Sequence, residues 1–218
     1  MSDEALIEKT AVFIKEKMLG EGSGHDWWHV YRVWQVAKTI ADNEPDADRL
    51  TVELGALLHD VADWKFAGGD LEAGSRAARA WLESCEADDQ IIRHIEEITR
   101  SVSFRGAKVE LELKTIEAKI VSDADKLDAI GAIGIARTFA YGGSKNRSMY
   151  EPDEKPVLHA TFEEYKNSQS HTINHFYEKL LLLKDIMQTA TGKKIALSRH
   201  KYMEVYLQEF YKEWEGKA

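Results

Sequence analysis

The sequence has little cysteine, little proline and no long apolar run. Only one of its 218 residues is cysteine, Cys85, so no internal disulfide can form, which fits a reducing compartment. No apolar run approaches the roughly 20 residues that span a bilayer. The first ten residues, MSDEALIEKT, lack the basic and apolar regions of a signal peptide. We therefore expect a soluble, cytoplasmic protein.

An excess of basic charge is also absent. The chain has 29 Lys and Arg against 38 Asp and Glu, which gives a net charge of −9. Nucleic-acid polymers and anionic membranes are bound through basic surfaces. We therefore expect neither a nucleic-acid polymer nor a membrane as partner, although a local basic pocket for a phosphate remains compatible with this charge.

Apolar residues recur at helical spacing along most of the chain, and no stretch shows a convincing strand pattern. The sequence therefore predicts an all-α fold. Its length is compatible with a single domain over 1–218, with a core at about 20–140 and C-terminal helices at about 159–215 packed on it. Residues 142–158 form the one convincing long loop, a candidate substrate-facing segment. The predicted helices cover about 7–18, 30–41, 50–61, 71–85, 91–102, 113–140, 173–187 and 196–214.

The third predicted helix contains adjacent polar residues, His59 and Asp60, in the apolar stretch LGALLHDVADW. A buried ionised Asp without a partner is costly, so something should compensate its charge. One interpretation is a hydrogen-bonded pair near a helix end, and the other is a metal site.

Two further segments carry residues that could complete such a site. His25 and His29 are four residues apart near the start of the second predicted helix, so they share one helical face. Asp123, Asp125 and Asp128 lie in an apolar helical pattern further on. Imidazole and carboxylate ligands suit Mn, Fe, Co, Ni or Zn, and a carboxylate-rich site also tolerates Mg. Spacing alone does not decide between Asp123 and Asp125 as the distant ligand.

Several motifs resemble those of the HD-domain phosphohydrolases, and most closely those of small bacterial predicted hydrolases similar to YedJ. The similar segments lie between about Gly24 and Trp214 and include GHDWWHVYRV, LLHDVADWKF, SFRG, DADKLDAIGAIGIAR and HFYEKLLLLKD. The resemblance implies an HD-type helical bundle with additional C-terminal helices. It also implies one divalent metal ion held by His29, His59, Asp60 and Asp125, because the family's distant ligand precedes a basic residue and a leucine.

The implied activity is metal-dependent hydrolysis of a phosphoester or phosphoanhydride in a nucleotide or another small phosphate, by metal-activated water. Related enzymes place a carboxylate at the position of Asp63, our candidate general acid or base. The candidates for binding the substrate phosphate are Lys65, His94, Arg105 and Lys126.

Two other classes of function stay open. A two-iron HD-type oxygenase needs two additional histidines between the HD pair and the last Asp, and only His94 lies there. A non-catalytic metal- or ligand-sensing domain would have no evident need for four buried ligands. The pair His171 and His175 in HTINH lacks the Glu of zinc-protease motifs, so we expect no metal there. The sequence leaves open whether the protein is a monomer or a homodimer.

Overall fold

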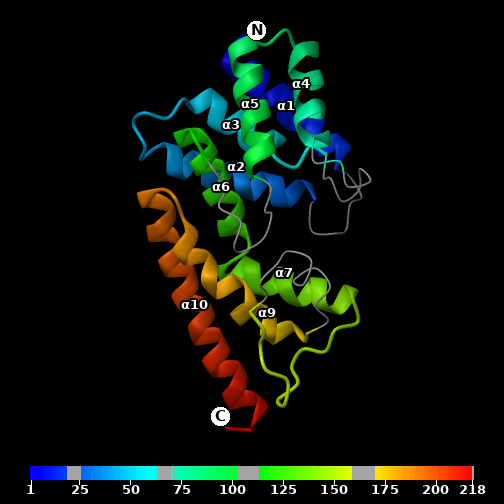
Figure 1. Ribbon diagram of the computed structural model, residues 1–218, viewed down its shortest axis with the longest axis vertical. Helices are drawn as coiled ribbons and strands as arrows, with labels where there is room; N and C mark the ends of the chain where they lie inside the picture. Colours follow the sequence, from blue (N-terminus) through cyan, green and yellow to red (C-terminus); the bar gives the residue numbers. More distant parts are fainter. Residues whose placement is uncertain (19–25, 63–69, 71, 103–112, 159–169, 218) are drawn as a thin grey trace. The chain divides into compact units, whose positions relative to one another are not determined.

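The computed structural model describes residues 1–18, 26–62, 70, 72–102, 113–158 and 170–217. Every regular element in these ranges is a helix, which confirms the all-α fold class (Figure 1). The described residues divide into two compact units. The N-terminal unit extends to Asp125 and the C-terminal unit begins at Lys126, so the boundary lies within one helix. A single domain over 1–218 stays a prediction.

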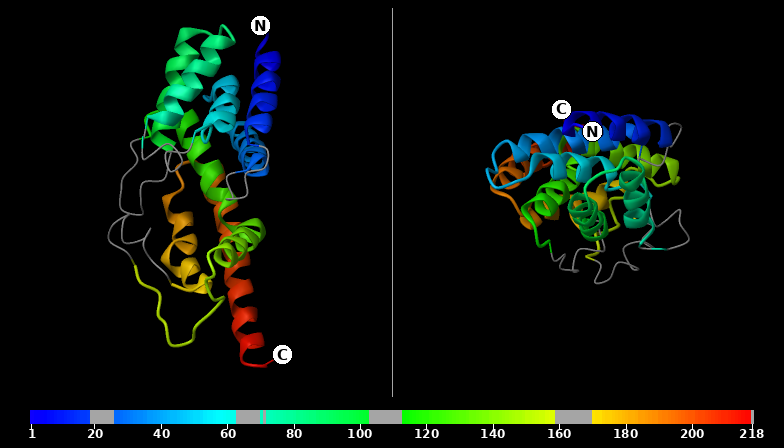
Figure 2. Two further views of the ribbon diagram at one scale, coloured as in Figure 1. Left: turned by 90° about the vertical axis from the view of Figure 1, so that its right-hand side faces the viewer. Right: turned by 90° about the horizontal axis from the view of Figure 1, so that it is seen from above.

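The N-terminal unit contains five helices and most of a sixth. Helix α3 contacts α1, α2 and α5, and α4 packs along α5, as two views of the ribbon show (Figures 1 and 2). The helices are α1 (Asp3–Lys17), α2 (Trp27–Ala41), α3 (Arg49–Leu58), α4 (Ala73–Ser84), α5 (Asp89–Val102) and α6 (Ile116–Asp128).

Helix α3 lies at the centre of this unit, because every residue from Thr51 to Leu58 is buried. Its one buried acid, Glu53, accepts hydrogen bonds from Trp34 Nε1 at 2.7 Å and Arg49 Nε at 2.8 Å, which offset the cost of burying the charge. Gly55 permits close packing of this helix on its neighbours. A Cβ there would lie 3.3 Å from side-chain atoms of Ile98 and Val121, on α5 and α6 respectively.

The C-terminal unit consists of the end of α6, then α7 (Gly131–Ser144), α9 (Thr172–Glu178), the 3₁₀ helix η1 (Leu180–Ile186) and α10 (Ala190–Trp214). Helix α10 contacts both α7 and η1. The ring of Phe176, fully buried, lies 6.1 Å from Phe139 and 6.0 Å from Tyr206, so aromatic side chains of three helices form the centre of this core.

Two predicted helices are each divided in the structure. The predicted helix over 113–140 is broken between α6 and α7, because Gly131 adopts φ +78°, a left-handed conformation that ends a helix. The predicted helix over 173–187 changes at Lys179 from α to 3₁₀. Leu180 and Leu183 are both buried, and their spacing of three matches the period of a 3₁₀ helix.

The predicted loop at 142–158 begins later than expected, because α7 extends to Ser144. Backbone amides of Thr172 and Ile173 donate to the carbonyls of Ser148 and Met149, each at 3.0 Å. Further along, the amide of Val157 donates to Glu178 Oε1 at 3.1 Å. This segment is therefore hydrogen-bonded to the start and to the end of α9.

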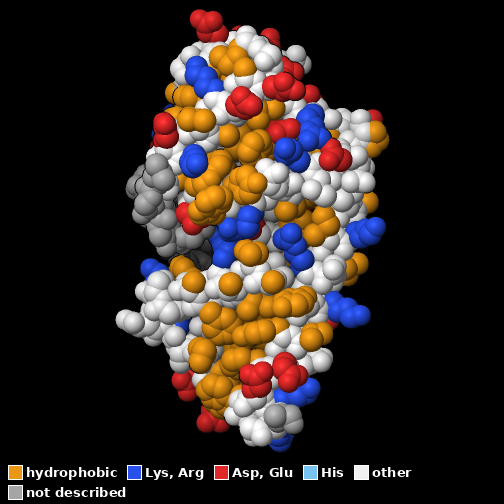
Figure 3. Space-filling model, turned by 180° about the vertical axis from the view of Figure 1, so that it is seen from behind, with side chains coloured by type: hydrophobic (Ala, Val, Ile, Leu, Met, Phe, Trp, Pro, Cys, Tyr) orange, Lys and Arg blue, Asp and Glu red, His pale blue; other side chains and the backbone are white. Residues whose placement is uncertain are grey.

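Within the described ranges, no helix combines the length and apolar character needed to cross a membrane. On the face shown in Figure 3, acidic and basic side chains are interspersed.

Candidate metal centre

His29 is fixed at the start of α2 by a helix cap. Asp26 precedes the helix, and its Oδ1 accepts a hydrogen bond from the amide of His29 at 2.9 Å. The cap holds the first turn, and the His29 side chain is only 2% exposed. Asp26 thus supports the predicted ligand His29, a role that was not assigned to it from the sequence. The available signal was an Asp directly before an apolar helical pattern.

His59 and Asp60 lie at the end of α3. The apolar pattern predicted that both lie inside the third helix, but the helix ends at Leu58 and His59 is its C-cap. His59 Nδ1 donates to the carbonyl of Ala56 at 2.7 Å. This bond leaves Nε2 of the neutral imidazole as the acceptor, which is the usual arrangement of a metal-binding histidine.

The side chains of the four predicted ligands come from three segments, and their atoms lie near the two imidazole nitrogens. His29 Nε2 lies 3.4 Å from His59 Nε2, and each nitrogen lies 3.5 Å from Asp60 Oδ2. Asp125 Oδ1 lies 3.5 Å from His29 Nε2 and 3.9 Å from His59 Nε2. Ligands bound about 2.1 Å from one ion are roughly 3.0–3.4 Å apart in octahedral or tetrahedral geometry. The separations of 3.4–3.9 Å are slightly longer than these values, and the donor atoms are of the types that bind divalent cations.

The two kinds of ligand differ in exposure. The imidazoles of His29 and His59 are 2% and 3% exposed, whereas the carboxylates of Asp60 and Asp125 are 18% and 28% exposed. The histidines thus form the buried side of the cluster and the carboxylates its accessible side. An ion held here would have an open side for further ligands.

The structure brings Asp125 to the two histidines. Ligand atoms of His29, His59 and Asp125 all lie within 4.8 Å of one another. Neither Asp123, which is fully buried, nor Asp60 is a member of this group, although Asp60 Oδ2 lies 3.5 Å from both imidazole nitrogens. Two residues along a helix point to different sides, so only one of Asp123 and Asp125 can face the histidines.

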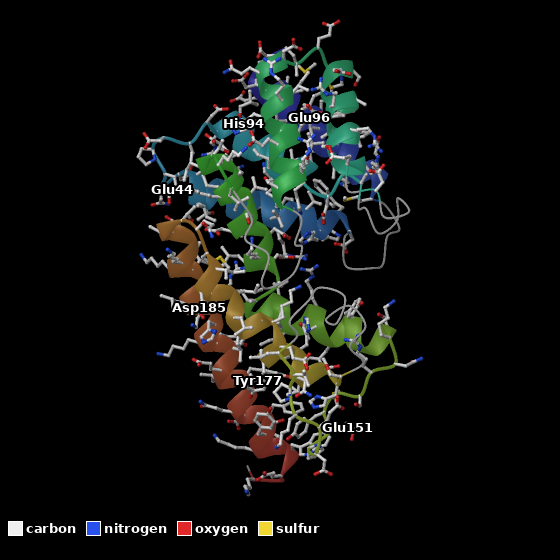
Figure 4. The ribbon with its side chains drawn as sticks, viewed as in Figure 1. Glu44, His94, Glu96, Glu151, Tyr177 and Asp185 are labelled. Carbon is white, nitrogen blue, oxygen red and sulfur yellow. The ribbon has the colours of Figure 1, made fainter. Side chains whose placement is uncertain are left out.

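Of the other site residues predicted from the sequence, some lie outside the described residues and some lie within them. Asp63, Lys65 and Arg105 lie outside the described residues. His94 Nε2 lies 3.0 Å from Thr115 Oγ1 and 3.6 Å from Glu117 Oε2. It projects from the side of α5 opposite Glu96, which pairs with Arg79 (Figure 4). Lys126 follows Asp125 directly and is 7% exposed. Phosphate binding by these residues stays a prediction.

The HTINH segment uses its histidines differently. His171 is the N-cap of α9: its Nδ1 accepts from the amide of Asn174 at 3.2 Å, and its Nε2 donates to the carbonyl of Glu154 at 3.3 Å. Both ring nitrogens are therefore engaged with the backbone. Burial, together with the positive charges of Lys179 and Arg147, lowers the pKa of His175 to about 3.

Comparisons with known proteins agree with this helical fold and its histidine–aspartate cluster. Residues 27–130 match the family model of the HD domain. The Bacillus subtilis (strain 168) protein YpgQ is 34% identical over 220 residues, covering 96% of this chain and 94% of YpgQ. A crystal structure of an HD-superfamily hydrolase from Bacillus thuringiensis is 41% identical, with a TM-score of 0.78 and coverage of 98% of this chain and 99% of that one. The structure of B. subtilis YpgQ in complex with ADP is 30% identical, with a TM-score of 0.76 and coverage of 98% and 97%.

The fold and the cluster define an all-α protein with a His/Asp site of the kind that binds divalent metal ions. Within that class, the chain belongs to the HD-domain family, alongside YpgQ and the HD-superfamily hydrolases.

Proposed function

We propose that this protein is a metal-dependent phosphohydrolase that cleaves a phosphoester or phosphoanhydride bond of a nucleotide or another small phosphate. The observation that carries the proposal is the convergence of His29, His59, Asp60 and Asp125, with neighbouring ligand atoms 3.4–3.9 Å apart. The two carboxylates supply enough negative charge to neutralise a divalent cation. Together with the two imidazoles they provide four ligands, which leaves further coordination positions open.

The side chains of the cluster have distinct tasks in this proposal. The Ala56 carbonyl orients His59, and the Asp26 cap fixes the backbone of His29, so both imidazoles are held in place before an ion arrives. Asp60 and Asp125 supply the negative charge. A divalent cation bound here would lower the pKa of a water molecule and polarise a phosphoryl oxygen. Asp63, three residues after Asp60, is our candidate for moving the proton of that water.

The choice of a nucleotide as substrate class is supported by one relative. YpgQ of B. subtilis was crystallised with ADP, and its chain and this one match over nearly their full lengths. ADP contains both a phosphoanhydride and a phosphoester bond, so either bond type is compatible with this comparison. Among the residues that the structure describes, Lys126 and His94 remain our candidates for contacting the phosphate.

The experiment that tests the proposal is a measurement of bound metal in protein purified without added metal, for the wild type and for Asp60→Ala. We expect about one equivalent of a transition metal in the wild type and its loss in the variant, since one charged ligand of four is removed. A screen of nucleotide hydrolysis with Mn²⁺, Co²⁺, Ni²⁺ and Mg²⁺ should then show activity only in the wild type.

The matched control is Asp70→Ala, because Asp70 is a partly exposed carboxylate that pairs with Arg76 and is not one of the four predicted ligands. It should leave metal content and hydrolysis unchanged. Two irons per chain would instead support the oxygenase alternative. Wild-type protein that binds no metal even after titration would refute the proposal and favour a non-catalytic domain.

A further inference from the structure

Two arginines from different helices hold the C-terminal end of α6, three residues beyond Asp125. Arg137, on α7, donates from Nη1 to Asp128 Oδ2 at 2.8 Å and to the Asp128 carbonyl at 3.4 Å. Arg199, on α10, donates to the carbonyl of Leu127. Both guanidinium groups therefore contact carbonyls of the last turn, which lack the regular i to i+4 partners of a helix interior. The Leu127 carbonyl also accepts from the amide of Ile130 at 3.2 Å.

Gly131 makes this arrangement possible. Its φ of +78° turns the chain sharply after α6, and a Cβ at this position would lie 3.0–3.2 Å from Cβ, Cγ and Cδ of Arg199. A side chain there would therefore collide with the stem of the arginine. The turn between α6 and α7 is thus packed directly against the residue that caps α6.

The charges at this end of α6 are complementary. The Asp128 side chain is only 3% exposed, and its ion pair with Arg137 compensates a buried carboxylate. Cationic groups also stabilise the negative C-terminal end of a helix dipole. Burial lowers the pKa of Arg199, and the nearby negative charge of Asp128 acts in the opposite direction. The last turn of α6 is consequently held at a side chain and at two carbonyls.

We infer that Arg137 and Arg199 are positioning residues for the metal centre, because they fix the helical turn that presents Asp125 to His29 and His59. Asp125 and Asp128 are three residues apart in one continuous helix, so a shift or fraying of the last turn displaces the Asp125 carboxylate. That carboxylate is 28% exposed, the most exposed of the four predicted ligands, so surrounding packing constrains it least. The inference rests on the proposed metal site.

The test is the binding of Mn²⁺ by the full chain, measured by titration calorimetry for the wild type, Arg137→Met and Arg137→Lys. We expect Arg137→Met to weaken binding roughly 10- to 100-fold, the range typical of residues that support metal ligands. Arg137→Lys keeps the positive charge beside Asp128 and should recover part of the affinity. In the metal-free protein, amide hydrogen exchange at Asp125–Asp128 should be faster in Arg137→Met than in the wild type.

Two further variants separate positioning from general destabilisation. Leu207→Ala removes a buried side chain of α10 that has no role at the end of α6, and it should lower Tm without changing Mn²⁺ affinity. Arg199→Met tests the second arginine, and it replaces Arg137→Met in the Mn²⁺ titration if Arg137→Met does not fold. Wild-type affinity in a folded arginine variant, or an equal loss in Leu207→Ala, would overturn the inference and leave the proposed function standing. A wild type without Mn²⁺ binding would overturn both.

Discussion

The protein contains two histidine pairs with opposite environments. His29 and His59 lie 30 residues apart in sequence, yet their Nε2 atoms are 3.4 Å apart and face the carboxylates of Asp60 and Asp125. His171 and His175 have the i, i+4 spacing of many metal sites, but both ring nitrogens of His171 bond to the backbone. What the ring nitrogens face, rather than the spacing of histidines in sequence, distinguishes a metal centre from a structural motif.

The sharpest test of this difference compares His59→Ala with His171→Ala. Loss of one imidazole from the cluster should weaken metal binding by more than the roughly 100-fold upper range for supporting residues. His171→Ala should leave metal stoichiometry unchanged, because its nitrogens already serve the backbone. Metal analysis of both purified variants checks this. Equal loss of metal in the two would contradict the distinction.

The structural role of His171 predicts a large effect on folding. His171→Ala leaves the buried amide of Asn174 without its capping acceptor and removes the bond to the Glu154 carbonyl, which together should cost about 2–3 kcal/mol of unfolding free energy. His171→Asn retains a capping acceptor and should recover about 1 kcal/mol. Urea denaturation measures both values, and a stability loss below the experimental error in His171→Ala would refute the capping role.

The lowered pKa of His175 predicts acid lability. Because the pKa is about 3 in the folded protein and about 6.5 in an unfolded chain, protonation favours unfolding, and stability is lost as the pH falls below 6.5. At pH 5 this group should cost about 2 kcal/mol. His175→Gln should therefore lose about 2 kcal/mol less than the wild type between pH 7 and pH 5 in urea titrations. Parallel losses in both proteins would show that His175 is not the responsible group.

The smallest effect in this comparison concerns the caps. Asp26→Ala removes the cap next to His29 and should cost about 1 kcal/mol of stability. It should also weaken Mn²⁺ binding roughly tenfold through the displaced imidazole. Asp48→Ala removes the cap of α3 at the end remote from His59 and is the matched control. Asp48→Ala should lower stability by a similar amount but leave the Mn²⁺ affinity at the wild-type value. Equal Mn²⁺ affinities in the two variants would argue against a link between the Asp26 cap and metal binding.

Much of the fold was predictable because helical periodicity is a local property. The apolar patterns gave the helical class and the approximate positions of α1, α2, α5 and α10. The breaks at Gly131 and Lys179 depended on local backbone geometry that apolar periodicity does not register. The extent of α3 was overestimated for a similar reason, since an apolar run continues past Leu58 while the helix does not.

The site was predictable to a different extent. His59 and Asp60 were conspicuous as polar residues in an apolar run, but the sequence alone left Asp123 and Asp125 equivalent, and the family resemblance was needed to choose. The partners of Arg137 and Arg199 could not be read from the sequence. Arg199 is 72 positions from the carbonyl it contacts, and such long-range contacts exist only after the helices have packed.

The burial of Gly55 also bears on engineering the protein for heat resistance. Replacing a helical glycine with alanine commonly raises the free energy of unfolding by about 0.5–1 kcal/mol, provided that the site has room. The gain arises because alanine has less conformational freedom than glycine in the unfolded chain. At Gly55 the new methyl group would press on Ile98 of α5 and Val121 of α6 at 3.3 Å. Gly143 on α7 has no atom within 4 Å of such a methyl group. A consensus or library approach that treats these two glycines alike would gain thermal tolerance at one and risk disturbing the packing of the helical core at the other.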